Sequence, residues 1–359
     1  RRMCSLHSIY LYLGCNIELY IPAWVTMWPL APGDRRNFTA AEFHETAAQY
    51  FFLPSPGLAA LVGETISYKS RWGSRTVACD AYGDALLNAT LPGGAQQIWH
   101  DAAKLEVLEM SREMGLRAQP EVHTLFRDAV PAARREHLKK QVRGMIPDLM
   151  IALPVDGRGT VTEEVLAEVK TITFTTECTA YACARRAVPA SAVQQRAAGL
   201  EGQTERDLRR RDREWCGTAE GETGPLLARF RSFGKLRGLA FGVLGEASPD
   251  VHKLLGTLAN MGAEAHGLAA GGTTELAAKG ALAWMLKRRL ARVVLKNRAK
   301  MLLDRRCYVG PGAPTAGDGR TNAPRAAGPR GFSNRTFERT RWQQRAARGS
   351  YYTGDAAHA

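Results

Sequence analysis

The sequence predicts an α/β fold in which helices flank a small mixed sheet. Two short segments rich in Ile, Val, Leu and Thr, 145–153 and 165–174, are typical of strands. Longer segments with helical spacing precede and follow them. With 359 residues, 45% of them hydrophobic, the chain can bury a sizeable core in one large or two ordinary domains.

The N-terminal part, residues 1–95, shows no sustained periodicity. Its apolar stretch from Ser5 to Pro32 resembles a weak signal peptide or membrane segment. Asn16 and Glu18 interrupt that stretch well short of the run of about 20 apolar residues that a membrane span needs. We therefore expect a soluble chain without a membrane partner. Because the first residue is an arginine and not Met, it stays open whether the chain is a piece of a larger protein.

The number and spacing of the cysteines indicate in which cellular compartment the protein lies. There are seven cysteines and no CxxC pair, which favours neither a disulfide framework nor a zinc site of the usual ligand spacing. We expect an intracellular, nuclear protein.

The first strongly periodic element begins near Gln96 and continues to about Gly115, a residue that favours the end of a helix. A short strand is predicted at 121–126, followed by a basic loop or short helix at 129–141. The two central strands then enclose Asp156-Gly157, a good turn dipeptide, so they are expected to form a hairpin.

After the hairpin, the pattern predicts a charged helix at 190–215 and an apolar strand at 236–244. Ser248 as N-cap and Pro249 at the first helical position open the next helix. A basic amphipathic helix is predicted at 274–304, with Trp284, Leu290 and similar residues on its apolar side. The Arg-, Gly- and Pro-rich tail from Pro311 onward predicts disorder.

The predicted hairpin places the carboxylates of Asp148 and Glu168 at opposed positions on its two strands. Asp148 and Glu168 each lie ten residues from Arg158, so a loop centred there sets them opposite each other. Directly opposed residues have Cβ atoms about 4.5–5.5 Å apart. Two carboxylates at that distance repel unless a cation lies between them, and oxygen ligands suit Mg²⁺. Lys170 follows Glu168 at a spacing of two, so the two side chains share a face of the strand.

This arrangement suggests phosphodiester chemistry. A metal held by Asp148 and Glu168 can offset charge on a phosphate and lower the pKa of a bound water. Lys170 can orient that water or stabilise the developing charge. The alternative is an ordinary solvated strand face, which the apolar surroundings of both carboxylates disfavour.

The segments Ile146-Pro147-Asp148-Leu149-Met150-Ile151 and Leu166-Ala167-Glu168-Val169-Lys170 resemble the core of the PD-(D/E)XK nuclease superfamily. The resemblance covers about 97–260 and implies a restriction-endonuclease-like core. It implies Asp148, Glu168 and the backbone carbonyl of Val169 as ligands of Mg²⁺, or of Mn²⁺, with Lys170 as the catalytic cation. Many members add a glutamate from the first helix, for which Glu106 and Glu109 are candidates, and a polar residue from the following helix, here Gln195 or its neighbours Gln194 and Arg196.

A narrower resemblance is to restriction-like endonuclease domains at the carboxyl end of non-LTR retrotransposon proteins. Those domains often carry a Cys/His zinc cluster and an Arg-His-Asn or Arg-His-Asp tripeptide. Cys79-Asp80 with Gly83-Asp84, then Trp99-His100-Asp101, resembles a degenerate version. Ala85 and the missing second and third cysteines argue against bound zinc, and His100 is interpreted as a residue of the helix start. Such degeneration suits a decaying mobile-element copy.

Basic residues outnumber acidic ones 49 to 35, a net charge of +14 that favours a polyanionic partner, DNA or RNA. The alternative is a basic protein from an Arg-rich proteome. The predicted nucleic-acid contacts lie on the helix after the hairpin and on the basic helix: Arg196, Arg206, Arg209, Arg210, Arg213, Lys287, Arg288 and Arg289. Solvated helix faces are the alternative for each cluster.

We thus expect an undefined region at 1–95 with a zinc-binding remnant near 79–90, a nuclease-like domain at 96–262, a basic helical extension at 263–306 and a disordered tail at 307–359. The expected function is a Mg²⁺-dependent DNA endonuclease derived from a mobile element. Two alternatives stay open: an inactive nucleic-acid-binding remnant of such a nuclease, and an RNA-binding accessory protein.

Overall fold

The computed structural model describes most of the chain between the two ends. The described residues are 34, 36–51, 53–70, 73–122, 124–134, 146–155, 162–173, 189–266, 274–311 and 313. The apolar stretch Ser5–Pro32, the turn Asp156-Gly157 and almost all of the Arg-rich tail lie outside these residues.

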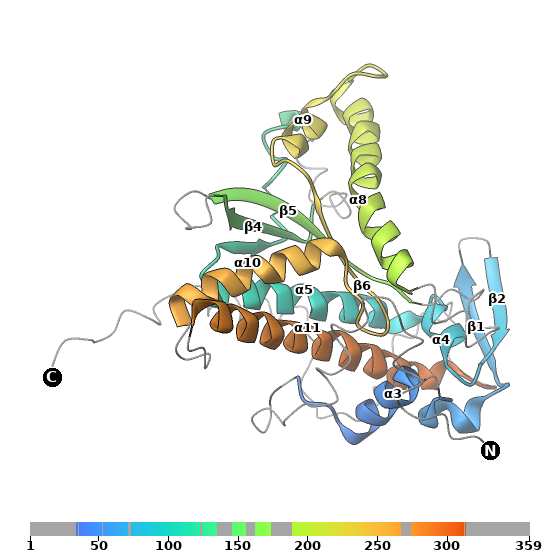
Figure 1. Cartoon of the computed structure of the whole chain (residues 1–359). Coiled ribbons are helices and arrows are strands. Elements are labelled where there is room, and N and C mark those ends of the chain that lie inside the picture. Colours follow the sequence, from blue (N-terminus) through green and yellow to red (C-terminus); the bar gives the residue numbers. More distant parts are fainter. Residues whose placement is uncertain are drawn as a thin grey trace. The chain divides into compact units, whose positions relative to one another are not determined.

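The central sheet has four strands in the order β3-β4-β5-β6 (Figure 1). Strand β4 (Leu149–Pro154) pairs antiparallel with β3 (Ala118–Pro120) and with β5 (Thr162–Thr171), and β6 (Arg237–Phe241) pairs parallel with β5. The predicted small mixed sheet is therefore confirmed. The strand expected at 121–126 is wrong, because pairing with β4 uses 118–120 and the following residues form turns.

Helices cover both faces of the sheet. Helix α8 (Pro189–Arg211) and the short α9 (Pro225–Arg231) lie on one face, where Leu166 of β5 packs with Leu200, Leu208 and Phe230. Helices α5 (Ala95–Glu113) and α10 (Pro249–His266) lie on the other. Figure 1 shows α11 (Glu275–Arg305) running below them.

Helix α5 begins and ends almost where the sequence predicted. Gly115, with φ of +84°, follows its C-cap residue Met114, a conformation that glycine adopts without strain. Helix α11 likewise begins after Thr274, whose side chain accepts the backbone N–H of Ala277. Helix α10 begins at Pro249 as predicted, but the Ser248 hydroxyl bonds to Gly238 and Ala240 of β6 and so ties the helix to the sheet.

Helix α11 is not the one-sided amphipathic helix that the sequence predicted. It packs against α5, α10 and α3 (Ala40–Tyr50), and residues are buried around most of its circumference. Some of its arginines lie inside: Arg305, 2% exposed, donates to the carbonyls of Leu86 and Leu87. The indole N–H of Trp99 on α5 donates to the carbonyl of Val294 at 2.9 Å, which joins the two helices through a buried bond.

The region before α5 is made of short elements that sequence periodicity could not reveal. They are α3, the 3₁₀ turn η2 (Pro56–Leu61), the hairpin of β1 (Thr65–Ser70) and β2 (Gly73–Ala78), the single-turn helix α4 (Asp84–Asn88) and η3 (Pro92–Gly94). Thr39 and Glu42 form a capping box at the start of α3.

Candidate active site on the β4–β5 hairpin

The two carboxylates of the motif occupy opposed positions on the hairpin. Strands β4 and β5 pair with Leu149 opposite Ala167 and Pro154 opposite Thr162. Continuing this register by one residue sets Asp148 opposite Glu168. The register predicted from the spacing around Arg158 is thereby confirmed.

The Asp148 carboxylate turns toward α5. Its Oδ2 accepts the backbone N–H of Val169 at 2.8 Å and lies 3.1 Å from Nε2 of His100. Its Oδ1 lies 3.9 Å from Nζ of Lys104. Because β4 pairing ends at Leu149, the Asp148 side chain takes over the hydrogen bond that a longer strand would make with Val169.

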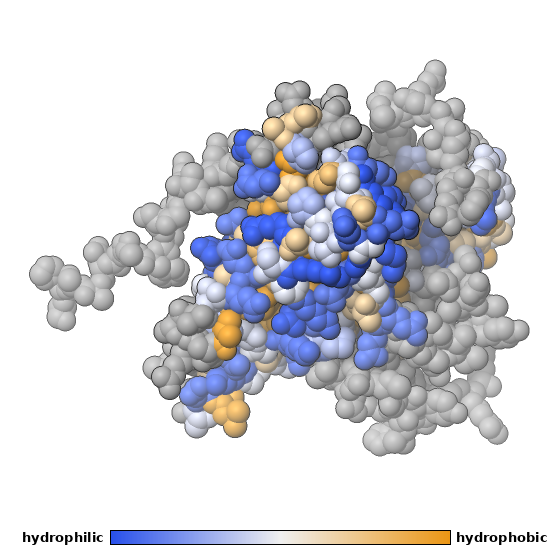
Figure 2. All heavy atoms as spheres, turned by 90° about the horizontal axis from the view of Figure 1, so that it is seen from above, coloured by the Kyte–Doolittle hydropathy of each residue, from blue (hydrophilic) through white to orange (hydrophobic). Residues whose placement is uncertain are grey.

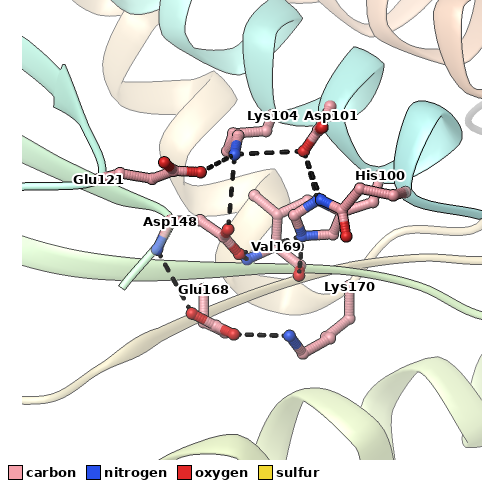
Figure 3. A network of polar contacts seen from close by, with 9 residues as sticks. His100, Asp101, Lys104, Glu121, Asp148, Glu168, Val169 and Lys170 are labelled. Carbon is pink, nitrogen blue, oxygen red and sulfur yellow. Dashed lines mark hydrogen bonds and ion pairs between the residues drawn. The ribbon is translucent and has the colours of Figure 1, made fainter. Parts of the chain in front are cut away.

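Glu168 and Lys170 lie on the other side of β5, toward α8 (Figure 3). Nζ of Lys170 donates to Oε1 of Glu168 at 2.6 Å, which confirms that the two side chains share a face. Oε2 of Glu168 accepts from the backbone N–H of Asp148 at 3.4 Å, a long hydrogen bond. The three charged groups are thus neighbours, but the Asp148 carboxylate does not point to the same side as Glu168 and Lys170. The prediction that all three side chains converge on one face is therefore wrong for Asp148, because His100 and the backbone of Val169 orient its carboxylate.

A polar cluster on α5 completes the site (Figure 3). Nε2 of His100 contacts Asp148 and lies 2.9 Å from the carbonyl oxygen of Val169. Nδ1 of His100 lies 3.1 Å from Oδ1 of Asp101. Lys104 lies 3.2 Å from Asp101 and donates to Glu121 at 2.6 Å. His100 and Lys104 therefore connect α5 to both strands of the hairpin.

The electrostatics follow from these contacts. Burial alone would lower the pKa of His100, but its hydrogen bonds to Asp101 and Asp148 outweigh burial and raise that pKa to about 9. Burial alone would raise the pKa of Asp148, yet the hydrogen bond and charge of His100 hold it below its usual range. Burial raises the pKa of Glu168, and the negative charge of Asp148 raises it further despite the neighbouring Lys170.

These observations fit a cation at the site. Oδ2 of Asp148 and the carbonyl oxygen of Val169 lie 3.1 Å and 2.9 Å from the same atom, Nε2 of His100. Both are oxygen donors of the kind that bind Mg²⁺. Glu168 is a largely buried carboxylate, 22% exposed, whose charge is disfavoured by Asp148. A nearby divalent cation would relieve that repulsion. Among the described side chains, no group of three or more His, Cys, Asp or Glu forms a preassembled metal cluster.

His100 is the residue whose place in the site the sequence reading missed. It lies near the start of α5, as the sequence predicted, and its ring, 15% exposed, also bonds to Asp148 and Val169. A signal was present: His100, Asp101 and Lys104 follow one another at i, i+1 and i+4 on one side of the helix that precedes the motif.

The candidate helix glutamates lie elsewhere. Glu106 is fully buried and paired with Arg289 of α11, and Glu109 lies 3.7 Å from the same guanidinium. Nine residues separate Glu109 from His100, about 13 Å along a helix. The structure therefore does not bring Glu109 to Asp148, which corrects its assignment as a ligand. Gln195 is exposed on α8, and so are Gln194 and Arg196.

Several predicted nucleic-acid contacts are engaged within the protein. Arg289 is enclosed by the three glutamates of α5, Glu106, Glu109 and Glu113, which corrects its assignment as a surface cation. Arg288 stacks over the ring of Trp284, 4.1 Å from its centroid. Three arginines of the segment after the hairpin form ion pairs with nearby carboxylates: Arg209, Arg210 and Arg213. Arg196 and Arg206 are exposed, and Lys287 is half-buried.

Figure 2 views the molecule from the side of α8 and α9. The described part of this face is mostly hydrophilic, and its hydrophobic residues form small, separate patches. The groups exposed on the described part of this face are therefore mainly charged and polar.

The segment around Cys79, where the sequence suggested a zinc-binding remnant, has a structural use. Oδ1 and Oδ2 of Asp80 accept the backbone N–H groups of Tyr82, Asp84 and Ala85, so this carboxylate caps the turn into α4. Cys79 is buried, and burial raises the pKa of its thiol to about 11.

Within the described residues, no helix combines the length and apolar character needed to cross a membrane. Comparison of the chain with protein-family models, curated proteins and solved structures gave no match. The site is therefore interpreted from its own geometry.

Proposed function

We propose that this chain is a metal-dependent endonuclease that hydrolyses DNA phosphodiester bonds at the β4–β5 hairpin. The observation that carries the proposal is the register that sets Asp148 opposite Glu168, with Lys170 paired to Glu168. Opposed carboxylates next to a lysine, beside the buried residues Leu149, Ala167 and Val169, are costly to maintain without a chemical use.

The element order supports a restriction-endonuclease-like core for the proposed enzyme. One helix, three antiparallel strands, a helix and a parallel fourth strand follow one another as α5, β3, β4, β5, α8 and β6, with the short α9 inserted before β6. The resemblance to PD-(D/E)XK nucleases implies a helix before and a helix after the hairpin, and α5 and α8 hold those places. A mobile-element origin is part of the same proposal and rests on the sequence resemblance alone.

The roles of the residues follow from their contacts. When bound, a divalent cation such as Mg²⁺ would offset charge on the phosphate and lower the pKa of a water. Asp148 and the carbonyl of Val169, which both lie next to His100, would hold it, and Glu168 would have to turn away from Lys170 to become a third ligand. Lys170, whose ammonium lies 2.6 Å from Glu168, would orient the attacking water or stabilise the developing charge. Lys104 and His100 fix the Asp148 carboxylate.

DNA is the proposed substrate because the chain is strongly basic, with a net charge of +14. Arg196 and Arg206 are exposed on α8, the helix that faces Glu168 and Lys170. Contacts of this kind neutralise phosphates without reading sequence, so we expect affinity to fall steeply with salt.

The test is conversion of supercoiled plasmid to nicked or linear DNA in Mg²⁺, by wild type and by Asp148→Asn. We expect cleavage by wild type only, and its loss in EDTA. Asp207→Asn, at a surface ion pair of α8, is the matched control and is expected to cleave like wild type. Cleavage by Asp148→Asn at the wild-type rate would contradict the proposal.

One observation favours a second candidate, a nucleic-acid-binding protein without nuclease activity. His100 already bonds to both Asp148 and the Val169 carbonyl, and a protonated imidazole there would replace a metal. This candidate predicts salt-sensitive DNA binding by wild type with no cleavage in any divalent metal.

A further inference from the structure

Two contacts of His100 define a point between α5 and the hairpin. Nε2 of His100 lies 3.1 Å from Oδ2 of Asp148 and 2.9 Å from the carbonyl oxygen of Val169. Two ligands at right angles on a metal with bonds of about 2.1 Å lie about 3.0 Å apart. The two distances therefore match edges of an octahedral coordination sphere as well as they match hydrogen bonds.

The other ring nitrogen is arranged as in a metal-binding histidine. Nδ1 lies 3.1 Å from Oδ1 of Asp101, and Asp101 is held by the side-chain amide of Gln97 at 2.7 Å and by Lys104 at 3.2 Å. A carboxylate on Nδ1 keeps the proton there and directs the lone pair of Nε2 outward. For His100 that direction leads to Asp148 and Val169 (Figure 3).

We propose that His100 is a direct ligand of the cation, together with Asp148 and the carbonyl of Val169, and that this nitrogen makes the site prefer Mn²⁺ to Mg²⁺. The inference rests on the proposed function in placing a cation at Asp148. It adds a ligand from α5, at a place in the helix where Glu106 and Glu109 do not reach.

The preference for Mn²⁺ follows from the donor set. Mg²⁺ binds almost entirely through oxygen and keeps several waters, whereas imidazole nitrogen suits first-row transition metals. Removing the nitrogen should therefore weaken Mn²⁺ binding much more than Mg²⁺ binding. Asp101 acts through His100 as a positioning residue, so its loss should have a smaller effect of the same kind.

The experiment measures binding of Mn²⁺ and of Mg²⁺ to the full chain without DNA, by calorimetry and by Mn²⁺ electron paramagnetic resonance. For His100→Ala we expect at least a tenfold loss of Mn²⁺ affinity and less than a threefold change for Mg²⁺. Asp101→Asn should give a smaller loss for Mn²⁺. His44→Ala, an exposed histidine of α3, is the control and should bind like wild type.

Unchanged Mn²⁺ affinity in His100→Ala would overturn the inference, and so would tighter binding, because the imidazole would then compete with the metal. A measurement on wild type guards against misfolding of the variant. In a nuclear magnetic resonance spectrum of the histidine rings, substoichiometric Mn²⁺ should broaden the His100 signals before those of His44. Sharp His100 signals at saturating Mn²⁺ would also overturn the inference. These binding measurements use no DNA, so they can fail independently of the proposed function. Mn²⁺ binding through His100 without plasmid cleavage would refute only the nuclease proposal. Plasmid cleavage without His100-dependent Mn²⁺ binding would refute only the role of His100 as a ligand.

Discussion

Replacing Arg289 by Met separates its structural use from the DNA contact that the sequence suggested. Its guanidinium bonds to Glu106 and Glu113, and Glu106 is fully buried. Removing one partner of a buried ion pair costs about 3–5 kcal/mol, because the other charge is left uncompensated. Arg36 stays 3.6 Å from Glu106, so we expect the lower end, about 3 kcal/mol. For a chain of this size that lowers the melting temperature by roughly 6 °C.

The assay is urea unfolding followed by circular dichroism, with DNA affinity measured on the same samples. Lys287→Met on the same helix is the control and should change the free energy of unfolding by less than about 0.5 kcal/mol. Adding Glu106→Gln to Arg289→Met should recover at least about 1 kcal/mol, because the two residues interact directly. If Arg289→Met unfolds like wild type but binds DNA tenfold more weakly, Arg289 is a nucleic-acid contact and the structural reasoning is wrong.

Three further predictions test the site and its scaffold. In metal-free protein, the raised pKa of His100, about 9, means that the bonds of this residue stabilise the fold fully below pH 6.5, its ordinary pKa, and that this stabilisation is lost as the pH rises through about 9. The difference in unfolding free energy between wild type and His100→Gln should shrink over that range, and a constant difference would contradict the shift. Gly238→Ala should destabilise the fold by about 1–3 kcal/mol, because a Cβ there would lie 2.7 Å from the carbonyl oxygen of Ala197. Gly199→Ala is the control and should not destabilise the fold, because the space around Gly199 is open. Equal melting temperatures for the two variants would refute the close packing of α8 on β6. Asp212→Ala should cost about 2 kcal/mol in urea unfolding, because the buried carboxylate accepts the first two backbone N–H groups after the proline of α9, and an unchanged midpoint would contradict that role.

The parts of the fold that the sequence could predict are those decided locally. The hairpin register followed from the distance of Asp148 and Glu168 to a shared turn, because antiparallel pairing conserves the sum of the residue numbers. The end of α5 followed from Gly115, whose backbone conformation stops a helix. The start of α11 was predicted at 274, and the Thr274 side chain caps the helix there.

The parts that could not be predicted depend on contacts between distant segments. The burial of α11 is decided by α3, α5 and α10 together, so a run of arginines that resembles a solvated face includes Arg289, enclosed by glutamates, and Arg305, bonded to carbonyls. The direction of the Asp148 side chain is likewise decided by His100, which is 48 residues away in sequence. Local patterns mark polar residues on a helix, such as His100, Asp101 and Lys104, but do not show which distant residues they contact.

The central claim is that the opposed carboxylates support chemistry rather than binding alone. The direct measurement is single-turnover cleavage of an end-labelled DNA duplex, at saturating protein and in Mg²⁺ or Mn²⁺, by Glu168→Gln and by Glu164→Gln. Glu164 lies on the same strand and is ion-paired at the surface with Arg117, so it is a matched control. We predict that Glu168→Gln cleaves at least a hundredfold more slowly than wild type with unchanged DNA affinity, while Glu164→Gln cleaves normally. Equal cleavage rates for the two variants, or none for wild type in either metal, would contradict the claim.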